Sequence, residues 1–279
     1  MKSTLAFVIA AVFALTQLGG SAISADRFIT VQSTTSTQNS GLYDYLLPIF
    51  SSETGIEVRV VAVGTGQAIK NARNCDGDVL LVHAKAAEEE FVASGHGVAR
   101  ADLMYNDFVL VGPAADPAEV AGSGAAVSAL KKIAATNAPF ASRGDDSGTH
   151  KKELALWADT GIDVGAASGS WYLETGSGMG ATLNIAVGMG AYALTDRASW
   201  IAFGNKGDLT IVVEGDPALF NQYGIIAVSP GKCPQVKTED ASAFIGWITG
   251  AEGQRAIAAY KHDGQQLFFP NAKPAGKSG

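Results

Sequence analysis

The sequence predicts an α/β fold with a largely parallel sheet. Short apolar segments at residues 26–32, 56–63 and 79–82 have the length and the β-branched content of buried strands. A helical pattern follows each of them, and the clearest is the set of apolar residues that recur at helical spacing over residues 42–50. Because strands that alternate with helices pair in parallel through crossover connections, the pattern indicates a sheet with helices on its faces.

The later part of the chain suggests a second lobe. A strand at residues 104–111 ends at Gly-Pro, and the small-residue region that follows is where we expect the chain to cross over. It should return near residue 211 and end in one long helix at residues 241–259. The predicted division is a first lobe of residues 26–110 and 212–270, a second lobe of residues 111–211, and a disordered tail at residues 271–279.

Residues 1–25 have the features of a secretory signal peptide. Lys2 precedes an apolar stretch from Leu5 to Leu18, and small residues lead up to Ala25. The alternative is a membrane anchor, but about 14 apolar residues are short for a span. We therefore expect cleavage after Ala25 and an exported, soluble mature protein. The net charge of −7 argues against nucleic acid as a partner, because a phosphate backbone would be repelled.

The chain has two cysteines, Cys75 and Cys233. In an exported protein such a pair is a candidate disulfide, and the alternative is two free thiols. The bridge would join segments far apart in the sequence, which is consistent with both lying in one lobe.

One motif stands out, the segment of residues 142–150 (SRGDDSGTH) directly ahead of a predicted helix. The start of a helix has unpaired backbone N–H groups and the positive end of the helix dipole, so it favours an anion. Ser147 and Thr149 add hydroxyl donors, Gly148 permits close approach, and Arg143 offers a planar fork of donors. Capping of the helix without a ligand would explain the Ser and Asp residues but not the Arg. One of the two aspartates is expected to orient the guanidinium.

Similar polar residues follow other predicted strands. Thr34, Thr35 and Ser36 lie between a strand and a helix, and Thr65 lies in a second junction of the same kind. Since ligands in open α/β sheets bind at the carboxyl ends of the strands, we assign these residues to the same anion site, with His83 and Ser142 as weaker candidates. A solvated loop is the alternative for each cluster alone.

The motif set indicates binding rather than catalysis. The four histidines are scattered, so no metal site and no cofactor is predicted. A serine hydrolase using Ser147 and a secreted adhesion or structural protein remain as alternatives from other classes. A site made only of donors suits an oxyanion without a proton at neutral pH, such as tungstate, molybdate or sulfate. Hydrogen phosphate would need an acceptor, and after the strand at residues 79–82 the chain offers His83 rather than a carboxylate, with Asp145 or Asp146 as the alternative acceptor.

Several segments together resemble the periplasmic tungstate-binding component of ABC transporters. They cover most of the chain from about Phe28 to Pro270, at residues 34–37, 40–42, 63–66, 81–84, 104–108, 142–150, 178–184 and 221–224. The Arg-x-x-Asp-Ser-Gly-Thr core is also similar to the anion loop of phosphate-binding proteins, so phosphate is the nearest rival ligand. Cys233 departs from the family pattern.

The resemblance implies a two-lobed periplasmic-binding-protein fold of type II, with a mixed sheet and flanking helices in each lobe and a ligand cleft between them. It implies a monomeric, non-enzymatic protein that delivers tungstate or molybdate to a permease and an ATPase. Carried over to this sequence, the residues that grip the oxyanion are Thr34, Thr35, Ser36, Arg143, Ser147, Gly148 and Thr149.

Overall fold

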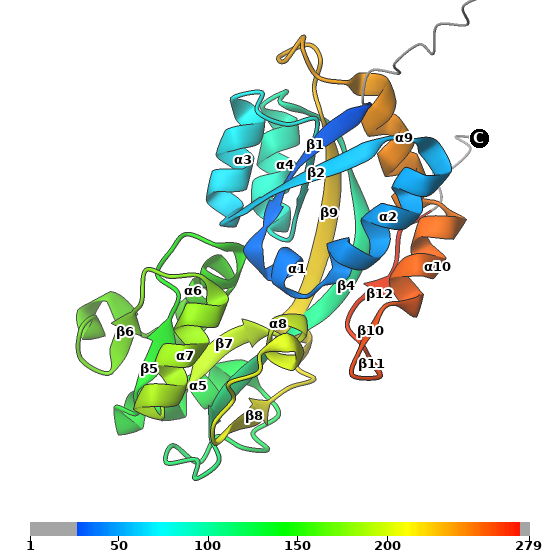
Figure 1. Ribbon diagram of the computed structural model, residues 1–279. Coiled ribbons are helices and arrows are strands. Elements are labelled where there is room, and N and C mark those ends of the chain that lie inside the picture. The colour runs from blue at the N-terminus through cyan, green and yellow to red at the C-terminus, as the bar shows by residue number, and fades with distance from the viewer. Residues whose placement is uncertain (1–26, 274–279) are drawn as a thin grey trace, which may run out of the picture.

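The computed structural model describes residues 27–273, which form two lobes (Figure 1). The upper lobe contains β1 (Phe28–Thr34), α1 (Thr35–Asn39), α2 (Leu42–Thr54), β2 (Glu57–Val63), α3 (Thr65–Arg73), β3 (Val79–Val82), α4 (Lys85–Ala93), α9 (Thr238–Thr249), α10 (Ala251–Ala259), β10 (Lys261–His262), β11 (Gln265–Gln266) and β12 (Phe269–Pro270). The lower lobe contains α5 (Ala126–Thr136), β5 (Phe140–Ser142), α6 (Gly148–Thr160), β6 (Tyr172–Glu174), α7 (Met179–Met189), β7 (Ala193–Asp196), α8 (Arg197–Ala202) and β8 (Leu209–Val213). The predicted signal peptide lies outside the described residues.

Two long strands, β4 (Gly97–Pro113) and β9 (Phe220–Val228), connect the lobes. The main sheet has the order β12-β4-β9-β3-β1-β2, and β7 and β8 pair with the far end of β4. Among the described strands of this sheet only β2, β1 and β3 pair in parallel, because β9 returns from the lower lobe and therefore runs antiparallel to β3 and β4. The mixed α/β architecture confirms the predicted fold class, whereas the expectation of a largely parallel sheet was wrong.

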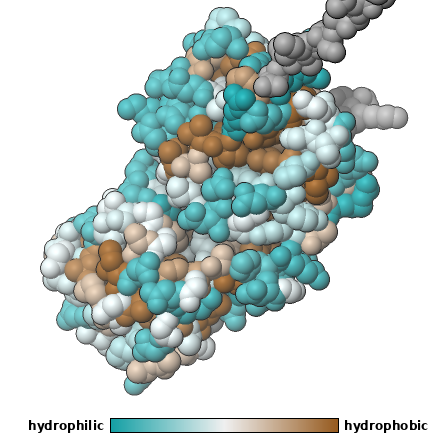
Figure 2. All heavy atoms as spheres, in the orientation of Figure 1, coloured by the Kyte–Doolittle hydropathy of each residue, from teal (hydrophilic) through white to brown (hydrophobic). Residues whose placement is uncertain are grey.

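The upper sheet is covered on both faces. Val79 and Leu81 face a core formed with α2, α9 and α10, whereas Leu80 and Val82 face one formed with α3 and α4. This alternation follows from the two-residue period of a strand, and it explains why β3 is apolar at every position. Figure 2 shows a hydrophobic band across the upper lobe where the edge strand β2 runs in Figure 1.

The lower lobe has its own apolar clusters on the two faces of β4. Phe108 and Leu110 pack with α5 and α6, and Val109 and Val111 pack with α7. Val213 of β8 also packs in the first of these clusters, and Tyr223 of β9 is the next large core residue that belongs to the upper lobe. The apolar packing of the lower lobe thus begins within β4 and ends before β9. A continuous strand has no break in composition that would mark this point in the sequence.

The predicted helix at residues 241–259 is in fact two helices. Gly250 has extended backbone between α9 and α10, and a Cβ there would lie 2.7 Å from the carbonyl oxygen of Gly246. Gly253 is similarly constrained, because its Cβ would lie 2.5 Å from Cα of Ile248. The two glycines let α10 fold back closely against the end of α9.

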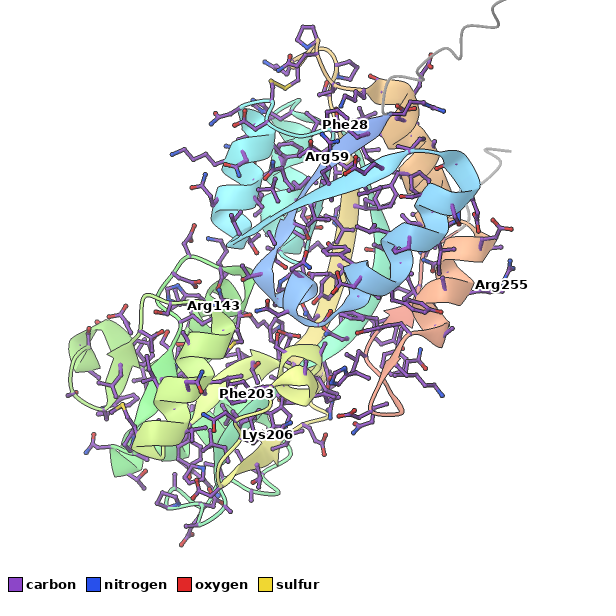
Figure 3. All side chains as sticks on the ribbon, in the orientation of Figure 1. Phe28, Arg59, Arg143, Phe203, Lys206 and Arg255 are labelled. Carbon is purple, nitrogen blue, oxygen red and sulfur yellow. A yellow bond between two sulfur atoms is a disulfide. The ribbon has the colours of Figure 1, made fainter. Side chains whose placement is uncertain are left out.

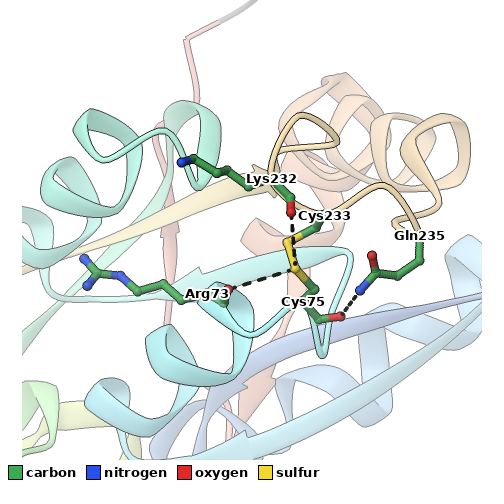
Figure 4. Close-up of a disulfide and its surroundings, with 5 residues drawn as sticks. All are labelled: Arg73, Cys75, Lys232, Cys233 and Gln235. Carbon is green, nitrogen blue, oxygen red and sulfur yellow. Dashed lines mark hydrogen bonds between the residues drawn. A yellow bond between two sulfur atoms is a disulfide. The ribbon is translucent and has the colours of Figure 1, made fainter.

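The two cysteines form a disulfide, so this prediction is confirmed (Figure 4). The bridge ties the turn after α3 to the loop between β9 and α9, and Gln235 donates to the carbonyl oxygen of Cys75 at 3.4 Å beside it. At the other end of the chain, Asn271 exchanges hydrogen bonds with Gln222, so the ordered chain extends beyond the start of the predicted tail. Within residues 27–273, no helix has the length and apolar character needed to span a membrane.

Candidate functional site

Helix α6 begins at the predicted anion motif. Ser147 is its N-cap, and its hydroxyl accepts from the backbone N–H of His150 at 3.2 Å. The cap leaves the N–H groups of Gly148 and Thr149 in the first turn without partners inside the helix. Arg143 follows strand β5, and Figure 3 places it at the top of the lower lobe, on the side that faces the upper lobe.

The upper lobe contributes two junctions at the carboxyl ends of parallel strands. Thr34 ends β1 and caps α1, and Thr65 opens α3 directly after β2 and Gly64. Since β1 and β2 pair in register from Phe28 with Glu57 to Thr34 with Val63, both junctions lie at the same edge of the sheet. That edge faces the start of α6.

A small cavity lies between the two lobes. Its walls are hydroxyl groups, backbone, one imidazole and one guanidinium, from Thr34, Thr35, Ser36, Val63, Gly64, Thr65, His83, Arg143, Ser147 and Gly148. Most of the residues predicted for the site are therefore brought together here. Val63 and Gly64 belong to the cavity as well, although only their position at a strand end could have indicated it.

Two predicted residues lie off the cavity wall. Thr149 is completely buried, and its hydroxyl oxygen has no hydrogen-bond partner among the described residues. Ser142 lies behind Arg143, where its hydroxyl pairs with Tyr172 at 3.0 Å, and Tyr172 in turn donates to Glu153 at 2.6 Å. Burial raises the pKa of Glu153 to about 7. Ser142 therefore belongs to a buried network that supports β5 and α6.

Arg143 is nearly inaccessible to solvent, with 3% of its surface exposed. Its Nη2 pairs with Asp145 Oδ2 at 2.5 Å, and Asp145 Oδ1 accepts from the N–H of Ser147 at 3.2 Å. This arrangement confirms that one aspartate orients the guanidinium. Nε of Arg143 has no partner among the described residues, so a donor remains for a ligand.

The lobes are in contact across the cavity. The hydroxyl oxygen of Thr65 accepts from the N–H of Gly148 at 3.0 Å. A Cβ on Gly148 would lie 2.9 Å from that oxygen and 3.1 Å from Cε1 of His83, so a side chain here would hold the lobes apart. Gly66 is close to the lower lobe too, because its Cβ would meet the Asp146 carboxylate at 2.2 Å.

His83 has two polar neighbours. Its Nε2 lies 3.3 Å from the Ser36 hydroxyl, and its Nδ1 lies 3.1 Å from Oδ1 of Asn221, whose amide donates to Asn106 at 2.7 Å. Burial lowers the pKa of the imidazole, and the nearby Arg143 acts in the same direction. The sequence analysis did not assign Asn221 and Asn106 a role. The available signal was an asparagine in each of two segments that carry the family resemblance, residues 104–108 and 221–224.

The arrangement around Ser147 differs from that of a hydrolase. Its hydroxyl is used for capping, and Nδ1 of His150 accepts from the N–H of Asp146 at 3.1 Å. The described residues contain no group of three His, Cys, Asp or Glu side chains that could hold a metal ion. The cavity instead offers donors from three chain segments to one small anion.

Comparison with known proteins agrees with this geometry. A family model described as "PBP superfamily domain" matches residues 20–252. The tungstate-binding protein TupA of Peptoclostridium acidaminophilum is 51% identical over 248 residues, which are 88% of this chain and 86% of that protein. The chain belongs to the PBP superfamily and to the family of the TupA proteins.

Two solved structures of this family are similar along their whole length. The tungstate-binding protein TupA from Desulfovibrio alaskensis G20 is 50% identical, with a TM-score of 0.76, and the match covers 88% of this chain and 100% of that one. The tungstate ABC transporter structure from Geobacter sulfurreducens is 49% identical, with a TM-score of 0.77, and the match covers 85% of this chain and 100% of that one. The two-lobed solute-binding fold of the TupA family is thus shared by this chain.

Proposed function

We propose that this TupA-family chain captures tungstate, with molybdate as the nearest competitor, and delivers it to the permease of an ABC transporter. The observation that carries the proposal is the cavity between the lobes, in which hydroxyl groups, backbone N–H groups and one buried Arg converge. The names of the relatives support the choice of anion. The predicted signal peptide and the family support a periplasmic, monomeric protein with no cofactor.

The ligand set we propose is Thr34, Thr35, Ser36, Thr65, Arg143, Ser147, Gly148 and Thr149. Most of these groups are neutral donors, so they stabilise an anion without a matching number of positive charges. Hydrogen bonds to a charged group contribute about 1.5–3 kcal/mol each, and several together can support tight binding after the cost of association. Thr149 enters the set through its buried, unpartnered hydroxyl.

We also propose that β4 and β9 are the hinge between the lobes. The upper lobe would then comprise residues up to about 107 together with residues from about 220, and the lower lobe would comprise the residues between them. The support is the apolar packing, which changes from the upper to the lower clusters along β4. Closure about these strands would bring Thr65 to Gly148 and enclose the anion, because only a closed form lets both lobes donate to it.

The first test is thermal unfolding with equal concentrations of tungstate, molybdate, sulfate and phosphate. Ligand at a thousandfold excess over its Kd stabilises the native state by about 4 kcal/mol, which corresponds to a Tm increase of roughly 8–16 °C for a chain of this size. We expect this increase with tungstate and little with phosphate. A shift with phosphate alone would make the chain a phosphate-binding protein, and no shift with any anion would contradict the proposal.

The proposal includes the absence of catalysis. Ser36, His83 and Asn221 are connected in the order of a hydrolase triad, but the small space that Ser36 faces between the lobes has no room for an ester with a leaving group. We expect no turnover of p-nitrophenyl acetate or p-nitrophenyl phosphate above that of the Ser36→Ala variant. Turnover lost in Ser36→Ala would contradict the proposal, and turnover lost in Ser147→Ala would support the predicted hydrolase alternative that uses Ser147.

Replacement of Thr149 by Val should weaken tungstate binding by roughly 1.5–3 kcal/mol, about 10- to 150-fold, because it removes one hydrogen bond to a charged group. It should leave the stability of the ligand-free protein unchanged or slightly higher, since the hydroxyl has no partner in the protein. Calorimetric titration and urea unfolding measure the two effects. Thr160→Val, at the other end of α6, is the matched control and should bind normally. Normal binding by Thr149→Val would remove Thr149 from the ligand set.

A further inference from the structure

We propose that His83 takes up a proton when the anion enters the cavity, and that this proton converts the Ser36 hydroxyl from a donor to His83 into a donor to the anion. The inference rests on the proposed function. It concerns the selection between proton-free and proton-bearing anions at the same site.

The proposal follows from the hydrogen-bond chain Asn106–Asn221–His83–Ser36. The amide nitrogen of Asn221 donates to Asn106, so its oxygen faces Nδ1 of His83 at 3.1 Å. Nδ1 must therefore carry a hydrogen, and in a neutral imidazole the lone pair is then on Nε2. Ser36 Oγ lies 3.3 Å from Nε2, so its hydroxyl can donate to that lone pair, while the Thr34 hydroxyl at 3.3 Å on its other side can donate to Ser36. In this state Ser36 can only accept from a molecule in the cavity.

A proton on Nε2 reverses the last hydrogen bond. The proton comes from solvent, forms an N–H bond with the lone pair, and makes both ring nitrogens donors, to Asn221 and to Ser36. The Ser36 hydroxyl is then free to rotate and donate to the anion. Both partners of the ring offer oxygen atoms, so the surroundings match the hydrogen-bonding needs of an imidazolium. Burial alone opposes the charge, and a dianion in the same cavity offsets that opposition.

The two charged groups that act most directly on the ring have opposite effects on its protonation. Arg143 disfavours a positive imidazole, whereas buried Asp196 at the start of α8 favours it. Tyr223 stacks on the ring at 4.8 Å and Phe108 lies at 6.3 Å, and neither carries charge at neutral pH. The remaining charged groups line the wider cavity on the other side of His83 and are Lys85, Asp102, Lys151 and Lys152.

That wider cavity gives the proton a path. It has a volume of about 730 Å³ and is lined by His83, Asn221 and Gly148 among others. His83 is thus part of the wall of both cavities. The ring can exchange a proton with solvent on one side while the anion stays enclosed on the other.

The two states of His83 favour different anions. With neutral His83 the Ser36 hydroxyl donates to the ring and presents only its oxygen to the cavity, which suits an anion that still carries a proton, such as hydrogen phosphate. With charged His83 the Ser36 hydroxyl can donate to the anion instead, which suits tungstate. Because linkage is reciprocal, tungstate should bind more tightly as the pH falls, by up to about tenfold per pH unit where one proton is taken up per anion.

The test is calorimetric titration of the mature protein with sodium tungstate near pH 7, in buffers that differ in ionisation enthalpy. We expect uptake of up to one proton per anion for the wild type and none for His83→Gln. His150→Gln is the near-site control, because the His150 ring has a buried Nε2 without a partner among residues 27–273, and this variant should keep the uptake. His96→Gln, near the disulfide end of the upper lobe, should match the wild type in every respect.

A second variant tests the mechanism without removing the ring. Asn221→Asp places a carboxylate at Nδ1, which should protonate His83 before the anion arrives, so the uptake should disappear while tungstate still binds. Tungstate binding without proton uptake in the wild type, or uptake that persists in His83→Gln, would overturn the inference and leave the proposed function intact. Failure of the wild type to bind tungstate would overturn both.

Discussion

Replacement of Arg143 by Ala should reduce tungstate affinity by about 3–5 kcal/mol, or roughly two to four orders of magnitude. The guanidinium is 3% exposed and, among the described residues, is the one permanently charged cation in the wall of the small cavity. Its removal deletes charge-assisted hydrogen bonds to the anion. It also leaves the Asp145 carboxylate, now at 2.5 Å from Nη2, without its partner and close to a dianion. Calorimetric titration with sodium tungstate measures the loss.

Three further variants separate the contributions to this effect. Arg143→Lys keeps the charge but not the planar fork, and its affinity should fall between those of the wild type and Arg143→Ala. Arg143→Ala combined with Asp145→Asn should recover part of the affinity, because the uncompensated carboxylate is gone. Arg255→Ala is the matched control, since Arg255 is exposed and points away from the lobes in Figure 3. Near-normal affinity of Arg143→Ala would exclude this cavity as the tungstate site.

The positions of the candidate site residues could be predicted because local chain geometry determines most of them. A hydroxyl residue between a parallel strand and a helix must lie at the carboxyl edge of the sheet, and this holds for Thr34 and Thr65. The motif at the start of α6 is equally local, and the bond between Arg143 and Asp145 spans two residues. Such features depend on neighbours in the chain, so they can be read without knowledge of the tertiary structure.

Apart from the disulfide, which the presence of two cysteines indicated, features that depend on distant pairing could not be predicted. Asn221 reaches His83 from 138 residues away, through the antiparallel register of β9 with β3 and β4. Nothing near either residue in the sequence indicates that register. The passage of β4 through both lobes is similar, because a continuous strand gives no compositional sign of the change in packing partner. The break between α9 and α10 did have a local sign in Gly250, which a helical pattern on both sides concealed.

Removal of the disulfide should lower the stability of the protein without changing its affinity for tungstate. The bridge closes a loop of 158 residues that includes the entire lower lobe, and in the chain-entropy account a loop of that length contributes up to about 5 kcal/mol, with 2–5 kcal/mol usual. Hydrogen bonds also hold these loops together in the native state, because the Asp78 carboxylate accepts from the N–H groups of Thr30 at 2.8 Å and Lys237 at 2.7 Å. The effect should therefore act through the unfolded state, and the Tm of Cys75→Ser/Cys233→Ser should fall by roughly 5–15 °C.

Reductant should destabilise the wild type by the same amount and leave the double variant unchanged. A large loss of tungstate affinity in the double variant would contradict this account, since the bridge lies at the end of the upper lobe away from the cavity (Figures 1 and 4).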